Sequence, residues 1–140
     1  MNPPRTINGI VFSDLGQASS FMRLDWVMSA LNQSLGFSPY PATLNLRPKA
    51  EEDAATWEII QREHKSVRLA SGERGFCDAR LFLVAIEKPA GATRQKSQGA
   101  VLLPQVPGYP KDKIEVVSPV RLKDELRLRD GDQVLLEFIP

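Results

Sequence analysis

Residues 39–46 read PYPATLNL, and the alternation in this stretch indicates the kind of fold that the chain adopts. Two prolines enclose a tyrosine, and the segment from Thr43 to Leu46 then alternates polar and apolar side chains, as a half-buried strand does. Residues i and i+2 of a strand lie on the same face. The sequence therefore predicts a short strand that presents the hydroxyl of Thr43 and the amide of Asn45 side by side.

The region before this strand predicts one helix and one further strand. Apolar residues recur at helical spacing between Leu24 and Leu35, and Gly36 follows as a residue suited to a left-handed helix cap. Residues 6–13, TINGIVFS, have the composition of a first strand. The small polar residues at 14–20 indicate a loop between that strand and the helix.

The region after the strand predicts more strands and many turns. Residues 49–56 are polar and predict a loop or a short helical turn, and residues 88–99 predict a long flexible connection. Strands are predicted at 66–69, 80–86, 99–104, 113–117 and 133–139, with a helical turn at 122–126 and a tight turn at 130–132. Because no helices alternate with these strands, a parallel α/β sheet is disfavoured. We expect a mainly β fold, a small closed or nearly closed barrel with one main helix, as a single domain over residues 1–140.

The bulk properties fit a water-soluble domain. The chain has 140 residues, of which 42% are apolar and 25% charged, and its net charge is +1. This balance gives no field that favours nucleic acid or an anionic membrane. The N-terminal residues lack the apolar run of a signal peptide, and no segment is long enough to cross a bilayer. With a single cysteine no internal disulfide is possible, so we expect a cytoplasmic protein.

Several kinds of chemistry lack their usual residues. His64 is the only histidine and lies in a charged stretch, which favours a surface position. Cys77 has no histidine near it in sequence, so a small core residue is favoured over a nucleophile. The three adjacent acids at residues 51–53 are expected to be solvated. An enzyme built from this sequence would need a reaction dominated by positioning and charge neutralisation, and phosphoryl transfer is such a reaction.

Two longer blocks carry a resemblance to a known family. LGFSPYPATLNL at residues 35–46 and YPKDKIEVVSPVRLKDELRLRDGDQV at residues 109–134 together resemble the CTP-dependent riboflavin kinases first known from archaea. The likeness extends from about Gly9 to Phe138. It implies a six-stranded cradle-loop β-barrel. It also implies an enzyme that transfers the γ-phosphate of CTP, or of another nucleotide, to riboflavin and forms FMN with Mg²⁺ as cofactor.

The resemblance also assigns roles to individual residues. Thr43 and Asn45 match the family's metal ligands, which suits Mg²⁺ because this ion prefers hard oxygen donors. Glu115 matches a glutamate that contacts the flavin, and it is the candidate catalytic residue. We expect it to line the same cavity as Thr43 and Asn45. Pro107 falls at a second flavin-binding position. The nucleotide-binding positions fall at Asp14, Leu15, Gly16, Gln17, Ala18 and Ser19, and at Val120, Arg121, Leu122 and Lys123.

The sequence departs from the family pattern at four positions. Asp14 and Ala18 stand where the family has glycines, and a Cβ at a position that needs positive φ costs about 1 kcal/mol. Asp14 also brings a negative charge toward a triphosphate. Ala42 replaces a glycine. Pro107 replaces a hydroxyl residue and has neither a side-chain donor nor an N–H.

These departures leave two main hypotheses and a weaker third. The first is an active riboflavin kinase. The second is a barrel without catalytic activity that binds a nucleotide, a flavin or a protein partner. The third, a DNA-binding barrel, is disfavoured because the charge is balanced and no basic stripe is present.

Overall fold

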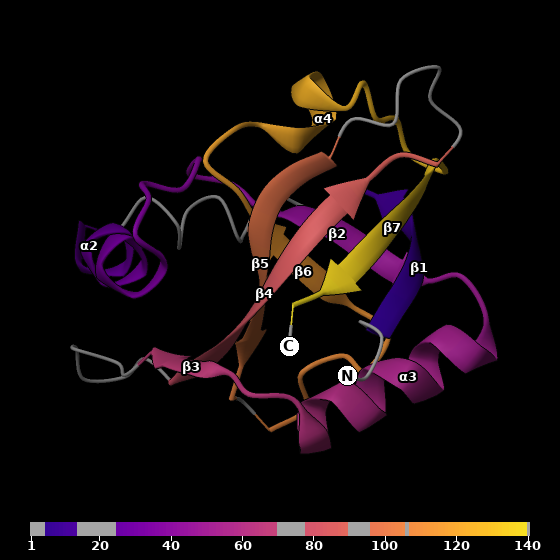
Figure 1. Ribbon diagram of the computed structural model, residues 1–140, viewed down its shortest axis with the longest axis horizontal. Helices are drawn as coiled ribbons and strands as arrows, with labels where there is room; N and C mark the ends of the chain where they lie inside the picture. Colours follow the sequence, from indigo (N-terminus) through magenta and orange to yellow (C-terminus); the bar gives the residue numbers. More distant parts are fainter. Residues whose placement is uncertain (1–4, 14–24, 70–77, 90–95, 106, 140) are drawn as a thin grey trace.

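The computed structural model describes residues 5–13, 25–69, 78–89, 96–105 and 107–139. In this part of the chain, seven antiparallel strands form one sheet in the order β3-β4-β5-β6-β2-β1-β7. The strands are β1 (Arg5–Phe12), β2 (Leu44–Pro48), β3 (Val67–Leu69), β4 (Ala79–Glu87), β5 (Lys96–Pro104), β6 (Ile114–Val117) and β7 (Gln133–Phe138). Pairing of β4 with β7 closes six strands into a barrel, and β3 lies outside it (Figure 1). The predicted mainly β, six-stranded barrel is confirmed.

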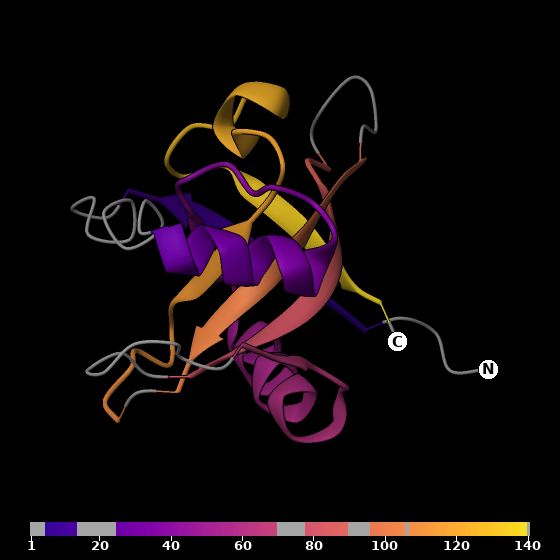
Figure 2. The ribbon, with the colours of Figure 1, turned by 90° about the vertical axis from the view of Figure 1, so that its left-hand side faces the viewer.

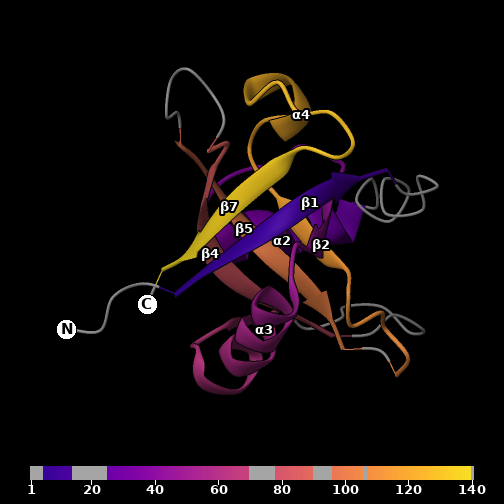
Figure 3. The same ribbon diagram turned by 90° about the vertical axis from the view of Figure 1, so that its right-hand side faces the viewer.

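The barrel interior is the main hydrophobic core. This core follows from the alternation of side chains along each strand. In β7, for example, the inward residues are buried and the residues between them are only partly buried. The strands contribute Ile7, Val11, Leu44, Leu46, Phe82, Val84, Ile86, Val101, Leu103, Ile114, Val116, Val134, Leu136 and Phe138. Helix α3 (Glu51–Glu63) and the short α4 (Leu122–Glu125) close opposite ends of the barrel (Figures 1 and 3).

A second core lies on the outer face of the sheet. Helix α2 (Asp25–Leu35) packs there through Leu31, Met28 and Leu35 against outward-facing residues of β3, β4, β5 and β6 (Figure 2). The predicted helical stripe therefore covers a sheet face. Gly36, with φ of 77°, ends this helix and donates its N–H to Asn32 O at 2.9 Å, as predicted for a cap.

Helix α3 differs from the prediction of a loop or short turn at residues 49–56. It runs for 13 residues, and Trp57 and Ile60 on one side enter the barrel core. Asp53 fixes its start, because Oδ2 accepts the Ala50 N–H at 3.1 Å and Oδ1 accepts the Asn8 N–H at 2.8 Å. Asp53 is buried, so the expectation that all three acids are solvated was wrong for this one.

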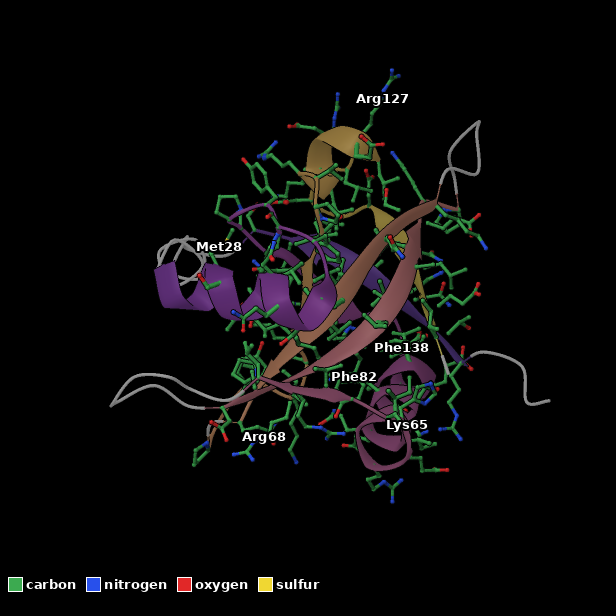
Figure 4. The ribbon with its side chains drawn as sticks, turned by 60° about the vertical axis from the view of Figure 1, so that its left-hand side comes forward. Met28, Lys65, Arg68, Phe82, Arg127 and Phe138 are labelled. Carbon is green, nitrogen blue, oxygen red and sulfur yellow. The ribbon has the colours of Figure 1, made fainter. Side chains whose placement is uncertain are left out.

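His64 is half-buried, so the predicted surface position holds only in part. It ends α3, and its ring packs edge-on against Phe138 with the centroids 6.2 Å apart. Its Nε2 is buried and has no hydrogen-bond partner. Figure 4 shows Phe82 and Phe138 together above α3, where Trp57 contacts both rings. Among the described helices, none has the length and apolar character required to span a bilayer.

The turn after α4 seals the other end of the barrel. Leu122, Leu126 and Leu128 are buried in the core at this end. Arg127 lies between two of these leucines in the left-handed region, with φ of 52°. This conformation directs its side chain away from the barrel (Figure 4) while both flanking leucines face inward. The three leucines thereby anchor α4 and the turn after it in the core.

Candidate functional site

A cleft of about 280 Å³ opens beside α4. Figure 1 shows that α4 lies at the end of the barrel opposite α3. One wall is the segment that leads from α2 into β2, and the other is the segment that leads from β6 into α4. The end of β1 also contributes to the lining. The lining residues are Phe12, Ser13, Tyr40, Ala42, Thr43, Leu44, Asn45, Val116, Ser118, Val120, Arg121, Leu122 and Lys123. The cleft therefore collects side chains from three separate parts of the chain.

Thr43 and Asn45 lie together in this cleft, as the alternation predicted. Asn45 is opposite Phe12 on β1 and opposite Glu115 on β6, and it is buried. The Thr43 hydroxyl donates to Asn45 Oδ1, with the two oxygens 3.2 Å apart. Adjacent oxygen ligands of an octahedral Mg²⁺ lie about 3 Å apart, because each is about 2.1 Å from the ion. The spacing of these two oxygens fits such an ion.

A tight turn holds the strand entry in place. The Tyr40 N–H donates to Ser118 O at 2.7 Å, and the Ala42 N–H donates to Tyr40 O at 2.8 Å. Ser118 is itself fixed, since its hydroxyl donates to Gln98 O at 2.9 Å. One main-chain hydrogen bond, from the Tyr40 N–H to Ser118 O, therefore joins the two walls of the cleft.

Two cationic side chains line the cleft. Lys123 Nζ donates to Ser13 Oγ at 3.3 Å and lies 3.8 Å from Asp130 Oδ1, and the Ser13 hydroxyl donates to the same carboxylate oxygen at 2.8 Å. Arg121 bonds Asp124 Oδ1 at 2.7 Å. The ammonium group is therefore held at the end of β1, next to the strand position opposite Asn45.

The predicted nucleotide residues Val120, Arg121, Leu122 and Lys123 all line the cleft with Thr43 and Asn45. Val120 is exposed at its edge, whereas Leu122 also packs into the barrel core. The other predicted nucleotide loop, Asp14 to Ser19, lies outside the described residues. No cluster of three or more His, Cys, Asp or Glu side chains suited to a metal occurs in the described part.

Glu115 is placed differently from the prediction, because it does not line this cleft. It lies opposite Asn45 on the same sheet face, and it is buried. The Tyr109 hydroxyl donates to Oε2, and Lys113 Nζ lies 3.7 Å from Oε1. Both carboxylate oxygens are therefore engaged by partners outside the lining of this cleft. The sequence analysis missed Tyr109, since it precedes the strand and follows no periodic pattern.

Tyr109 belongs to a second cavity, of about 510 Å³, between α3 and the segment that joins β5 to β6. Its lining residues are Ala54, Trp57, Glu58, Gln61, Leu103, Pro104, Gln105, Pro107, Tyr109, Pro110, Lys111 and Asp112. Pro107 is therefore brought to this cavity and not to the cleft of Thr43 and Asn45. Glu115 lies between the two cavities, with Asn45 on one side and Tyr109 on the other.

Comparison with known proteins assigns the chain to a family. Residues 11–138 match the family model CTP-dep_RFKase, which carries the description "Domain of unknown function DUF120". The chain belongs to this CTP-dependent riboflavin kinase family. The predicted relationship is thereby confirmed over nearly the whole chain.

Curated relatives of this family member come from archaea. A riboflavin kinase of Archaeoglobus fulgidus is 33% identical over 134 residues, which are 95% of this chain and 54% of that protein. One of Methanocella arvoryzae is 34% identical over 131 residues, 91% of this chain and 54% of that protein. One of Saccharolobus solfataricus is 32% identical over 131 residues, 94% of this chain and 72% of that protein. The chain spans about half the length of the first two relatives.

Proposed function

We propose that this protein is a riboflavin kinase that transfers the γ-phosphate of CTP to the 5′-hydroxyl of riboflavin and forms FMN and CDP. The observation that carries the proposal is the pair of oxygens on Thr43 and Asn45, 3.2 Å apart, in a cleft that also holds Lys123. Membership of the riboflavin kinase family supports the reaction class. The proposal extends to CTP as the donor and to Mg²⁺ as the cofactor.

Thr43 and Asn45 would hold the metal through uncharged oxygens. A hydroxyl and an amide leave the ion's full charge available to phosphate oxygens, which Mg²⁺ binds together with several waters. The bound ion supplies charge neutralisation at the triphosphate. Because Asn45 is buried and opposed by strands on both sides, its amide keeps its position during turnover.

Lys123 and Arg121 supply the remaining positive charge. Phosphoryl transfer depends mainly on positioning and on neutralising charge on the phosphate oxygens. Lys123 is held by Ser13 and Asp130 at the end of β1, so its ammonium group is already placed before substrate binds. Arg121 lines the same wall and is paired with Asp124.

Riboflavin would lie on the Glu115 side of the paired oxygens. Its 5′-oxygen forms the new bond to the γ-phosphorus, the bond to the CDP oxygen breaks, and Glu115 receives the hydroxyl proton. The route from Asn45 past Glu115 to Tyr109 leads toward the second cavity, which is lined by Trp57 and Pro107. That cavity offers apolar and aromatic surface for the flavin ring, a composition common to small-molecule sites.

The test is FMN formation from riboflavin with Mg²⁺ and each of CTP, ATP and GTP, separated by chromatography. We expect FMN with CTP, none after chelation of divalent metal, and a loss of roughly a hundredfold in Thr43→Val or Asn45→Ala, comparable with the larger losses on disturbing metal sites. Thr56→Val is the matched control, because Thr56 lies on α3, at the other end of the barrel, and its hydroxyl donates to Glu52 O at 2.8 Å. Nucleotide binding without FMN from any nucleotide would instead favour a binding barrel.

A further inference from the structure

Two exposed apolar side chains lie on the nucleotide cleft. Tyr40 is 37% exposed and Val120 is 40% exposed, and they stand on opposite walls. In the described residues only five large hydrophobic side chains are this exposed: Tyr40, Val67, Leu83, Val120 and Ile139. Of these, Tyr40 and Val120 are the two that line the cleft, so the cleft has apolar surface that the proposed phosphate chemistry does not use.

The backbone presents Tyr40 rigidly. Prolines on both sides restrict the main chain, because each ring fixes its own φ near −65°. The N–H of Tyr40 is bonded to Ser118 O and its carbonyl to the Ala42 N–H. The aromatic ring is therefore held at the edge of the cleft by a turn whose main-chain groups are already bonded. A ring presented in this way loses little conformational freedom when a ligand packs on it.

The cleft has an apolar end and a polar end. At one end the main-chain bond between Tyr40 and Ser118 brings together the wall segments that carry Tyr40 and Val120. At the other end Asn45 is opposite Phe12, the last residue of β1. Ser13 follows Phe12 and accepts a hydrogen bond from Lys123. Thr43 lies between these ends, three residues from Tyr40. A ligand with a planar apolar part joined to a polyanion matches this order.

We infer that Tyr40 is the stacking platform for the nucleobase, with Val120 on the facing wall, while the triphosphate extends toward Thr43, Asn45 and Lys123. The inference rests on the proposed function and adds to it a residue that determines how the donor binds. An aromatic face contacts every base and does not distinguish hydrogen-bonding edges. Tyr40 therefore contributes to affinity for nucleotides in general, and any preference for cytosine comes from other contacts.

The experiment is isothermal titration, with Mg²⁺, of CTP, ATP and inorganic tripolyphosphate into the wild type, Tyr40→Ala, Tyr40→Phe and Tyr40→Trp. We expect Tyr40→Ala to bind both nucleotides about tenfold more weakly, which is about 1.4 kcal/mol and lies within the range for one base stacked on an aromatic ring. Tripolyphosphate affinity should be unchanged, since it has no base. Tyr40→Phe and Tyr40→Trp should stay within about twofold of the wild type.

Val67→Ala is the matched control, because Val67 is similarly exposed at 39% but lies on β3, away from the cleft. It should bind every ligand as the wild type does. An equal loss for nucleotide and tripolyphosphate in Tyr40→Ala would overturn the inference, because it would mean that Tyr40 only supports the turn before Thr43. Unchanged nucleotide binding in Tyr40→Ala would overturn it as well.

The same proteins separate this inference from the proposed function. A wild type that forms FMN while Tyr40→Ala binds CTP with full affinity removes the stacking role alone. If Tyr40→Ala loses nucleotide affinity as expected but the wild type forms no FMN, the kinase activity is ruled out and the stacking role is kept. A wild type that binds neither CTP nor ATP overturns both.

Discussion

The two cavities of this barrel are built in different ways. The cleft beside α4 is built around one strand position fixed by register, Asn45 between Phe12 and Glu115, and its other polar side chains come from the segments that flank β1, β2 and β6. The cavity beside α3 takes its walls from a helix and from a proline-rich connection, and its Trp57 is also part of the barrel core. Polar side chains of the first cavity can therefore be substituted without creating a void in the core. Substitution of Trp57 in the second cavity removes core packing.

Glu115 connects the two regions. It shares a sheet face with Asn45, yet its carboxylate accepts a hydrogen bond from Tyr109, which lines the other cavity. A reaction that joins a phosphate donor in one cavity to an acceptor from the other needs a group at this position. Under the proposed function, phosphate binding falls to the cleft beside α4 and acceptor binding to the cavity beside α3.

The largest expected effect is on stability, from Trp57→Ala. Trp57 is 2% exposed and contacts the rings of Phe82 and Phe138, so its removal leaves a cavity in the core. We expect the free energy of unfolding to fall by about 3–5 kcal/mol, measured by urea denaturation. Thr43→Val, in the other cavity, should change it by less than about 1 kcal/mol. Similar losses of unfolding free energy in Trp57→Ala and Thr43→Val would contradict the inference that Trp57 supports the core and Thr43 does not.

The second-largest effect is expected on turnover, in the variant Glu115→Gln. This change keeps the shape of the side chain but removes its ability to take a proton, and a general base contributes roughly a hundredfold or more. We expect the rate of FMN formation to fall about a hundredfold while CTP affinity, measured by titration, stays the same. Such a result would assign Glu115 to the acceptor side of the reaction.

Glu137→Gln is the matched control, because Glu137 lies on β7, away from both cavities, and pairs with Lys96 at 3.6 Å. It should leave turnover and affinity unchanged. If Glu115→Gln turned over at the wild-type rate, Glu115 would have no part in the mechanism. If it weakened CTP binding as strongly as it slowed turnover, its role would belong to the phosphate cleft.

The pairing of Thr43 and Asn45 in the cleft beside α4 could be predicted from the sequence, whereas the helix beside the second cavity could be predicted only in part. The period of two places Thr43 and Asn45 on one face whatever the partner strands are, and the structure has them in contact. Helix α3 has charged residues on most of its surface, so Trp57 and Ile60 alone marked its buried side. Its capping carboxylate, Asp53, bonds a strand 45 residues away, a contact that no local pattern contains.

The position of Glu115 shows a similar limit. The sequence analysis expected Glu115 to line one cavity with Thr43 and Asn45. Strand pairing does bring it opposite Asn45, but the position of a carboxylate depends on its hydrogen-bond donors. The donor is Tyr109, in an irregular segment whose path depends on how it packs against the core. A sequence pattern can therefore predict which face a residue occupies more readily than which cavity its side chain enters.

The smallest expected effect is on stability, from the turn that supports the cleft beside α4. The Gly131 N–H donates to Val11 O at 2.8 Å and the Val11 N–H donates to Asp132 O at 2.9 Å, so this turn is fixed to β1. It also carries Asp130, which holds Ser13 and Lys123. The hydrogen bond from the Arg129 N–H, and next the nearby Lys88, lower the pKa of the Asp132 carboxyl below its ordinary value. The ionised carboxylate therefore stabilises the turn.

Asp132→Asn tests this contribution through its pH dependence. Because the folded-state pKa is lowered, the stabilisation is present above the unfolded pKa of about 3.9 and is lost as the pH falls through the folded value. The side chain is one-third exposed, with a relative accessibility of 33%, so solvent screening limits the gain to less than about 1 kcal/mol. In urea denaturation the variant should be slightly less stable than the wild type at pH 7, and the gap should narrow below about pH 4. A gap that stayed constant from pH 7 to pH 3 would mean that the carboxylate's charge has no role and that only its shape supports the turn.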